Sequence, residues 1–403
     1  MRYSGRMKRI SALAVAGGAL LLVAGLGYLG FKPVPINAVA WDGKPSPGYS
    51  GAHAPNTRLA DLKLINTGKE SGPEHLVVRL ENGVQKLYAA FESGRIVRMN
   101  LDGTNQEVAA RTGGRVLGFD FDSQGRLIAA DAMLGLVAIG PDQTVNVLAS
   151  VLTDGDKRAS PIRYADAVVV ARSGKIYFTD ASQRFGPAQF GGTFEASVLD
   201  ILEQSSTGRV IEYDPSSSQA RVVATGFSFA NGIALSADEQ HVFVAETGKY
   251  RIWKLAVGAN NLQVNSGQTS PLASVLIDNL PGYPDNLMRG LPTAQGTPKL
   301  WVGLVKPRTA VVDSMAGKPW LREVTLRLPR ALWPIPKPYG HVFAFDESGK
   351  VLEDLQDPSG AYPETTSVTE LPDRLLLQSL HAKSIGWLPR TPTGAAPANL
   401  AKP

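Results

Sequence analysis

The sequence predicts an all-β protein, a six-bladed β-propeller preceded by one N-terminal transmembrane helix. Three observations lead to this prediction: an uncharged segment near the N-terminus, a scarcity of long amphipathic helices after it, and a short strand motif that recurs six times. Glycine (41) and proline (28) together make up 69 of the 403 residues, above the usual proportion, which indicates many turns. Hydrophobic residues reach 43%, so the chain has enough apolar side chains for a large core.

The recurring motif is a turn or polar lead-in followed by a strand rich in β-forming residues. Its copies are Gly83–Phe91, Gly125–Asp131, Gly174–Asp180, Asp238–Glu246, Lys299–Leu304 and Asp373–Leu380. The centres of successive copies lie 40, 49, 66, 58 and 75 positions apart, and a blade of four short strands needs about 40–50 residues. Six copies therefore predict six blades, with the wider gaps holding longer loops. A β-sandwich or a β-helix is the alternative, but a sandwich would show shorter and more even strand spacing.

The N-terminal segment predicts membrane insertion. Residues 10–31 contain no charged side chain, and four basic residues with no acidic one precede them. About 20 such residues span a bilayer core, and the preceding positive charges predict a cytoplasmic N-terminus with the propeller on the extracytoplasmic, periplasmic side. The competing interpretation is a cleaved signal peptide, because Ala38-Val39-Ala40 has the form of a cleavage site, although the apolar run is longer than in most signal peptides.

The remaining boundaries follow from composition. A stretch rich in proline, glycine and serine separates the apolar segment from the first strand, and a similar stretch ends the chain. We therefore expect a basic cytoplasmic tail at 1–9, a transmembrane signal anchor at 10–31, a linker at 32–56, a six-bladed propeller at 57–390 and a disordered tail at 391–403.

Composition also excludes several classes of function. The chain has no cysteine, which rules out disulfide scaffolds, zinc–thiolate sites and thiol catalysis. The formal net charge of +5 comes mostly from the four basic residues before position 10, because the rest has 37 basic and 36 acidic residues. We therefore expect no nucleic-acid partner.

Polar side chains occur at the ends of apolar strands in four segments, which are spread around the predicted ring. The segments are Gly72–His75, Tyr164–Ala167, Phe229–Gly232 and Pro284–Leu287. Carboxylate and amide oxygens that converge from several blades form the hard oxygen set that Ca²⁺ prefers. The pattern therefore predicts a calcium site where the blades meet.

Longer motifs resemble the strictosidine synthase-like family, whose broader relatives are gluconolactonases and paraoxonases. They are Gly226–Ser236, Val244–Ile252, Lys175–Ser182 and Leu280–Asn286 with Trp301–Gly303. The resemblance covers roughly residues 55–390, and the layout of an anchor followed by a propeller resembles membrane-associated members of the family. It implies a six-bladed propeller with a central Ca²⁺.

The resemblance also implies a set of metal ligands, namely Glu74, Asp166, Asn231, Asp285 and Asn286. Relatives usually have Asn-Asp where this chain has Asp166-Ala167. Asp166 retains a ligating oxygen and adds negative charge, whereas Ala167 has none, so a second calcium ion is not expected. A register slipped by one residue would place Ala165 at the ligand position and weaken the main site.

Two hypotheses of function follow. In the first, the protein is a membrane-anchored, Ca²⁺-dependent hydrolase of a small ester or lactone, in which the metal polarises the carbonyl and Asp285 or Glu74 acts as the general base for water. In the second, it is a non-catalytic membrane-tethered propeller that binds a ligand or a partner protein. The second is favoured by Ala167 and by the absence of a histidine from Arg115–Gly118, where lactonases often carry one over the metal. A lyase-like condensation is disfavoured, because Glu370 is the only acidic residue in 365–370.

Each candidate ligand also has a structural explanation. Glu74 can cap a loop, Asn231 and Asp285 lie beside turn-forming residues, and Asp166 can accept nearby backbone N–H groups. We predict that Asp131 and Asp180, at strand ends, satisfy backbone donors.

The remaining polar features are predicted to lie outside the site. The scattered histidines His75, His241, His341 and His381 are expected on the surface or in loops. The basic, aromatic and proline-rich segment 320–339 is expected to be an insertion between blades that packs on the outside; a lid over the channel or a membrane-facing loop are the alternatives.

Overall fold

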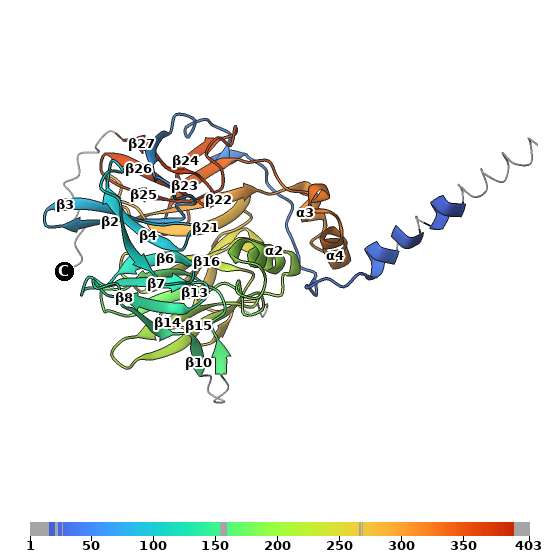
Figure 1. Ribbon diagram of the computed structural model, residues 1–403, viewed down its shortest axis with the longest axis horizontal. Helices are drawn as coiled ribbons and strands as arrows, with labels where there is room; N and C mark the ends of the chain where they lie inside the picture. Colours follow the sequence, from blue (N-terminus) through green and yellow to red (C-terminus); the bar gives the residue numbers. More distant parts are fainter. Residues whose placement is uncertain are drawn as a thin grey trace, which may run out of the picture.

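The structure is a computed structural model that describes residues 16–20, 23–25, 27–153, 159–265, 267 and 269–390 (Figure 1). The predicted tails at 1–9 and 391–403 lie outside these residues. Within the described part of the chain, no helix is long and apolar enough to cross a bilayer. The predicted transmembrane helix at 10–31 is therefore not confirmed.

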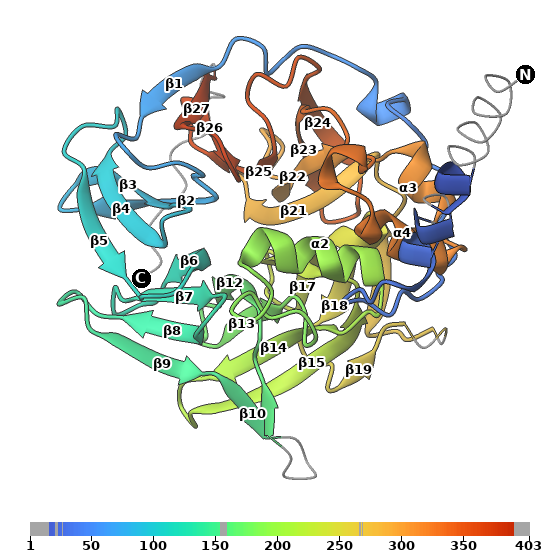
Figure 2. The ribbon, with the colours of Figure 1, turned by 45° about the vertical axis from the view of Figure 1, so that its right-hand side comes forward.

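Six antiparallel sheets of four main strands are arranged in a ring, which confirms the six-bladed propeller (Figure 2). Blade 1 contains β2 (His75–Glu81), β3 (Val84–Ala90), β4 (Arg95–Asn100) and β5 (Glu107–Arg111). Blade 2 contains β6 (Val116–Phe121), β7 (Leu127–Asp131), β8 (Gly135–Ile139) and β9 (Val145–Ala149). Blade 3 contains β12 (Ala165–Val170), β13 (Ile176–Asp180), β14 (Gly208–Asp214) and β15 (Gln219–Phe227), with the short parallel β19 (Leu262–Gln263) at its edge.

The other three blades follow the same order. Blade 4 contains β16 (Ala230–Leu235), β17 (His241–Glu246), β18 (Arg251–Ala256) and β20 (Ala273–Ile277). Blade 5 contains β21 (Gly282–Arg289), β22 (Lys299–Pro307), β23 (Gly340–Asp346) and β24 (Val351–Asp357). Blade 6 contains β25 (Thr365–Glu370), β26 (Arg374–Ser379) and β27 (Ser384–Pro389), and its fourth strand is β1 (Lys63–Asn66) from the N-terminal side.

The recurring sequence motif corresponds to the second strand of every blade: β3, β7, β13, β17, β22 and β26. These strands are buried on both faces, because each lies inside its own sheet and between two neighbouring blades; every residue of β7 and β13 is buried. The first strands of the blades contact one another in the cyclic order β2, β6, β12, β16, β21, β25 and back to β2. They therefore surround the axis, and we call them the innermost strands.

The core lies between adjacent blades. One cluster, for example, packs Tyr88 and Ile96 of blade 1 against Phe119, Leu127 and Val137 of blade 2. Stacking the sheets in a ring buries faces that a single blade would leave in water.

The ring is closed by β1, which pairs with β27 from Lys63↔Trp387 to Asn66↔Ser384. Ile65 of β1 is buried and packs with Leu76 of blade 1 and Leu376 of blade 6. A strand from the N-terminal side of the propeller thus completes the last sheet and covers the edge of β27.

Insertions between strands supply the helices. Helix α2 (Thr193–Glu203) joins β13 to β14, and it crosses the middle of the ring in Figure 2. Helices α3 (Ala310–Ser314) and α4 (Pro319–Arg327) and the 3₁₀ turn η3 (Arg330–Leu332) join β22 to β23. Two further 3₁₀ turns, η1 (Gly51–His53) and η2 (Thr247–Lys249), and the hairpin of β10 (Val151–Thr153) and β11 (Ala159–Pro161) complete the elements of the propeller. Before the propeller, the described residues 16–20, 23–25 and 27–31 are helical.

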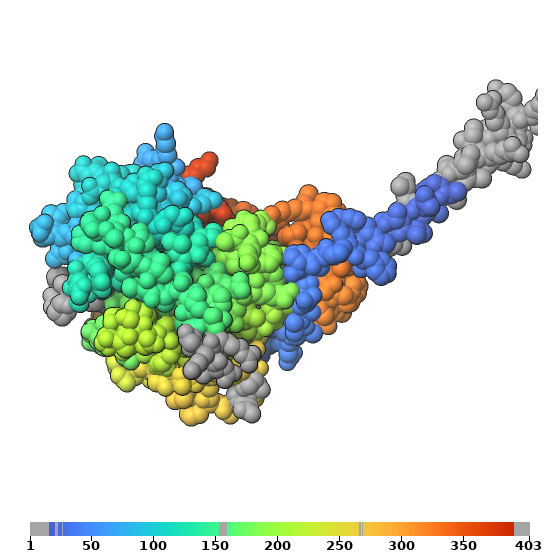
Figure 3. Space-filling view, turned by 60° about the horizontal axis from the view of Figure 1, so that its bottom comes forward, coloured from blue at the N-terminus to red at the C-terminus, as the bar shows by residue number. Residues whose placement is uncertain are grey.

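Residues 32–56, predicted as a linker, lie along the propeller, and we call them the N-terminal strap. Val39 N–H donates to the Glu203 carbonyl at 2.8 Å, and Ile36 is buried beneath α2 with Ala196 and Phe229. Figure 3 shows this segment in blue against the orange α3–α4 region, with the described residues before it extending away from the body. The strap therefore packs as part of the domain.

The far end of the strap is fixed by Asp354 of β24. His53 Nδ1 lies 2.7 Å and His341 Nε2 2.8 Å from the same carboxylate oxygen of Asp354, while the amides of Asn56 and Gln356 donate to the other oxygen. His341 is fully buried in β23. The expected surface location was therefore wrong for His341, because a neighbouring strand supplies its partner.

Candidate functional site

The residues that directly precede the innermost strands meet at one end of the axis. Four of them, Glu74, Arg115, Tyr164 and Phe229, line one polar cavity of about 100 Å³. We call it the axial cavity; the loop ends of a propeller converge on the channel there.

Acidic side chains at the ends of the second strands accept backbone N–H groups from the residues that lead into the innermost strands. Asp131 accepts the N–H of Arg115 at 3.2 Å, Asp180 accepts the N–H of Tyr164 at 2.9 Å, and Glu246 accepts the N–H of Ser228 at 2.9 Å. The prediction that Asp131 and Asp180 satisfy backbone donors is thus confirmed. In blades 2 and 3 the residue held in this way lines the cavity itself, and in blade 4 the next residue, Phe229, does so.

The structure brings four of the five predicted ligands to the axial cavity. Glu74, Asp166, Asn231 and Asp285 all line it and are all buried. Asn286 is also buried, but its Nδ2 donates to the Glu74 carbonyl at 2.9 Å, so its side chain supports the entry to β2.

Burial and mutual repulsion raise the pKa values of the three carboxyl groups. Burial raises the pKa of Asp166 well above its usual range, and the charges of Asp285 and Glu74 raise it further. The pKa of Asp285 is raised well above its usual range by burial and then by Glu74. Burial also raises the pKa of Glu74, although Arg115 opposes this effect. A cation is the group that would relieve this concentration of buried negative charge.

The chemistry of the cavity fits a hard divalent cation. Asn231 Nδ2 donates to Asp285 Oδ2 at 3.2 Å, whereas the Asn231 Oδ1 is buried and has no hydrogen-bond partner within the described part of the chain. An orphaned amide oxygen beside three carboxylates matches the oxygen ligands of Ca²⁺. Ala167 adds no oxygen and packs into the core between blades 3 and 4.

Sequence reasoning missed Arg115 as a site residue. Its guanidinium pairs with the Glu74 carboxylate, and both side chains are almost fully buried. A basic residue before an apolar strand gives no local signal of this pairing, because Arg115 opens blade 2 and Glu74 opens blade 1.

An apolar cavity of about 200 Å³ adjoins the axial cavity. The two share the lining residues Phe194, Ser197, Phe229, Asn231, Asp285 and Leu380. Other walls are apolar side chains of α2 and of the β22–β23 insertion, including Ile201, Val312, Trp333 and Ile335. The predicted location of segment 320–339 was therefore wrong: it interrupts blade 5 and covers the apolar cavity.

Of two further histidines, His75 departs from the expectation of a surface or loop position, and His381 agrees with it. His75 begins β2 and is buried, with its ring edge against Phe119 at 5.2 Å between centroids. His381 follows β26 in an exposed loop, as predicted, but it also lines the axial cavity. Its Nδ1 is hydrogen-bonded to the carboxylate of Glu364.

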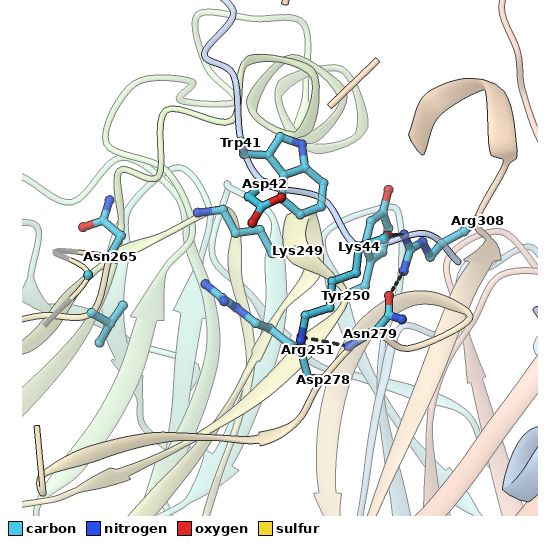
Figure 4. A pocket seen from close by; sticks show the side chains of 12 residues that line it. Trp41, Asp42, Lys44, Lys249, Tyr250, Arg251, Asn265, Asp278, Asn279 and Arg308 are labelled. Carbon is cyan, nitrogen blue, oxygen red and sulfur yellow. Dashed lines mark hydrogen bonds and ion pairs between the residues drawn. The ribbon is translucent and has the colours of Figure 1, made fainter. Parts of the chain in front are cut away.

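A separate pocket of about 310 Å³ lies between the strap and blade 4 (Figure 4). Arg308 points at Asn279 there, and its guanidinium also donates to the Lys44 carbonyl at 2.6 Å and lies 4.0 Å from the Tyr250 ring centre. None of the residues that line it lines the axial cavity. The contacts anchor the strap.

Comparisons with known proteins agree with this architecture. The family described as "Strictosidine synthase" matches residues 166–259, and "Strictosidine synthase-like, N-terminal" matches residues 51–99. The protein named strictosidine synthase-like 10 of Arabidopsis thaliana is 31% identical over 324 residues, which cover 74% of this chain and 79% of that protein. The adipocyte plasma membrane-associated protein of Salmo salar is 29% identical over 380 residues, which cover 89% of this chain and 84% of that protein.

Solved structures show the same fold. A gluconolactonase from Xanthomonas campestris aligns with a TM-score of 0.54 at 18% identity, over 87% of this chain and 97% of that one. A calcium-binding protein, regucalcin, from Agrobacterium tumefaciens aligns with a TM-score of 0.53 at 13% identity, over 81% and 92%.

Fold and site together define a six-bladed β-propeller with an acidic cavity on its axis. Sequence similarity makes the assignment more specific. The chain belongs to the strictosidine synthase-like family.

Proposed function

We propose that the protein is a membrane-associated, Ca²⁺-dependent hydrolase of esters or lactones that carry an apolar group. The observation that carries the proposal is the junction of two cavities: Asn231 and Asp285 line both the acidic axial cavity and its apolar neighbour. An ester has the same division, with a polar carbonyl beside a hydrocarbon chain. The known activities of proteins with similar folds do not decide whether this protein is a hydrolase, since one fold hosts many functions.

Glu74, Asp166, Asn231 and Asp285 are the residues that would hold the cation. When bound there, Ca²⁺ would supply Lewis-acid polarisation of a carbonyl group and stabilisation of the developing oxyanion. Asn231 orients the Asp285 carboxylate through its amide hydrogen bond, and Arg115 holds Glu74. Both predicted general bases, Asp285 and Glu74, are thus already engaged, which suits ligands better than proton carriers.

The apolar cavity supports the choice of substrate. Phe194, Ile201 and Trp333 present hydrocarbon surface, and so does Ile335, which lines the cavity and is also exposed to solvent. Burial of an acyl chain here would contribute about 0.8 kcal/mol per methylene. We therefore expect esters of longer acids to bind more tightly than acetates.

The test is hydrolysis by the full-length protein in detergent. p-Nitrophenyl esters from acetate to octanoate and aliphatic lactones are assayed with Ca²⁺ and with EDTA, for wild type and for N231A and D285A. We expect Ca²⁺-dependent hydrolysis in wild type and its loss in both variants, while N146A, at an exposed position in blade 2, retains it. Equal rates for wild type and the two site variants would show that the cavity is not catalytic.

A non-catalytic, membrane-tethered propeller that binds a ligand or partner protein is the second candidate. Arg115 favours it, because its ion pair with Glu74 competes with any cation for that carboxylate. Ca²⁺-dependent thermal stabilisation without turnover of any ester or lactone would support this alternative.

Membrane association through residues 10–31 forms part of the proposal. Relatives are named plasma membrane-associated, and Arg327 of α4 donates to the carbonyls of Lys32 at 2.7 Å and Leu29 at 3.2 Å, which fixes the start of the strap beside the apolar cavity. We expect the full-length chain to remain in the membrane fraction after a carbonate wash, and a protease added to the periplasmic side to reach the propeller. Release of the chain by the wash would contradict anchoring.

A further inference from the structure

His381 is held at the axial cavity by an acidic partner. It follows β26 in blade 6 and shares the cavity lining with Glu74 and Asp285. Its Nδ1 is hydrogen-bonded to Glu364, and within the part of the chain that the structure describes no hydrogen-bond partner is found for Nε2. The carboxylate therefore fixes the ring and the tautomer, and leaves Nε2 as the nitrogen available to a reacting molecule.

Glu364 is itself tightly constrained. It directly precedes β25, just as Glu74 directly precedes β2, and its second carboxylate oxygen pairs with Lys306. Its backbone has φ +53°, in the left-handed region that a residue other than glycine rarely adopts. Non-glycine residues in this region are concentrated at functional sites, where the surrounding structure holds them.

The imidazole lies in the axial cavity beside residues that line both cavities. The ring of Phe194, from α2, meets the His381 ring edge to face at 5.8 Å between centroids. Phe194 lines both cavities, and so does Leu380, the residue next to His381. A substrate whose acyl chain fills the apolar cavity therefore has its ester group close to His381.

We propose that His381, oriented by Glu364, is the proton carrier of the hydrolysis. This inference rests on the proposed function. Nε2 takes a proton from the attacking water as the oxygen–carbon bond to the carbonyl forms. It returns that proton to the leaving alkoxide oxygen as the acyl carbon–oxygen bond breaks, so that an ester yields an acid and an alcohol and a lactone yields a hydroxy acid. Glu364 keeps the Nδ1 proton throughout and acts as a positioning residue.

The charges around His381 shift its pKa, and this shift should be visible in the pH dependence of kcat/KM. The hydrogen bond with Glu364 raises the pKa of His381, the carboxylate of Glu92 acts in the same direction, and partial burial and Lys306 oppose it. Glu74, across the cavity, also feels the His381 charge. Because the general base must be neutral, kcat/KM should rise with pH through the raised pKa of His381. Glu364→Gln removes the negative charge and should move this rise to lower pH.

The experiment measures p-nitrophenyl hexanoate and an unactivated aliphatic δ-lactone with the full-length protein in Ca²⁺. We expect His381→Gln to lower kcat by about 100-fold or more, in the range for loss of a general base, with little change in KM or in the Ca²⁺-dependent rise of Tm. The loss should be greater for the lactone, because its alkoxide needs a proton to leave. Added imidazole should restore part of the activity of His381→Ala. His241→Gln, at the start of β17, is the matched control and should behave as wild type.

The outcomes separate this inference from the proposed function. Ca²⁺-dependent hydrolysis that persists at wild-type rate in His381→Gln would overturn the role of His381 and leave the hydrolase intact. An unshifted pH profile in Glu364→Gln would overturn the pairing as the positioning device. Absence of hydrolysis in the wild-type protein would overturn both proposals.

Discussion

The guanidinium of Arg115, which opens blade 2, pairs with the carboxylate of Glu74, which opens blade 1, in the wall of the axial cavity. The pair joins two blades and neutralises one of the three buried acids at the site. It also sets Arg115 in competition with any cation that uses Glu74 as a ligand.

Removal of this arginine should therefore destabilise the protein more without calcium than with it. In EDTA we expect Arg115→Gln to lower the free energy of unfolding by about 3 kcal/mol, because a buried carboxylate loses its partner. In saturating Ca²⁺ the deficit should shrink, so the Ca²⁺-dependent rise of Tm should exceed that of wild type. Arg98→Gln, which breaks the more exposed pairs with Glu81 and Glu107, should leave that rise unchanged. An equal rise in Arg115→Gln and wild type would contradict competition for Glu74.

The cluster around Asp354 should determine how firmly the strap is attached. Asp354→Ala leaves the imidazole N–H groups of the partly buried His53 and the fully buried His341 without this acceptor. We expect a loss of about 3 kcal/mol in unfolding free energy by urea titration, together with earlier proteolytic cleavage in residues 49–56. The control is Asp373→Asn, whose side chain is half-exposed and should change neither measurement. Unchanged cleavage of the strap in Asp354→Ala would show that other contacts suffice to hold it.

Asp200 should give the stability of the protein a specific dependence on pH. Burial raises the pKa of this α2 carboxyl to about 7 from its ordinary 3.8, and the charges of Glu203 and Glu246 act in the same direction. Because the folded state disfavours the ionised form, the contribution of Asp200 to stability is complete below pH 3.8 and is lost as the pH rises to 7. We expect Asp200→Asn to be more stable than wild type by up to about 4 kcal/mol at pH 8, and the difference to vanish near pH 4.

Urea titrations of both proteins at several pH values test this expectation. The exposed Asp61→Asn serves as the control for the loss of one acidic group. A pH-independent difference between Asp200→Asn and wild type would contradict the raised pKa.

The stability of the closed ring should depend on the buried face of β1, which carries Ile65, and not on its exposed face, which carries Leu64. Ile65 is buried between blades 1 and 6, whereas its neighbour Leu64 is 62% exposed. We expect Ile65→Ala to lower the unfolding free energy by about 3 kcal/mol, as for other large-to-small changes in a core, and Leu64→Ala to change it by less than about 0.5 kcal/mol. The same urea titration measures both. Similar losses in the two variants would mean that β1 does not seal the ring as the register indicates.

The six blades could be predicted because the second strand of each blade is buried by its neighbours on both faces. A strand such as β7, with all five residues buried, has an apolar sequence up to its last residue, Asp131, and stands out along the chain. The outermost strands expose some of their side chains to solvent, so their sequences are less apolar and give no comparable signal; β9, for example, exposes Asn146 and Val147. The number of blades could therefore be predicted from the second strands alone, because they are the most buried strand of each blade.

The site could be predicted only in part, because its residues divide into two kinds. Asn231 and Asp285 lie within innermost strands and belong to extended motifs, so a resemblance of the local sequence identifies them, and Asp166 is found by matching a segment that departs from the pattern of the relatives. Arg115 and the His381–Glu364 pair acquire their roles through contacts between blades or across a hairpin. Their neighbours in sequence say nothing of these contacts, and so reasoning from the sequence placed His381 in a loop without placing it at the site.

The union of β1 with β27 has a consequence for biosynthesis. Among the described strands β1 is the first in the chain and its partner β27 is the last, so blade 6 cannot be completed until residues 384–389 have been made. A chain stopped before residue 384 lacks β27, so β1 has no partner and β26 keeps an open edge. These exposed strands distinguish an incomplete product from a finished one for any chaperone or protease that binds them.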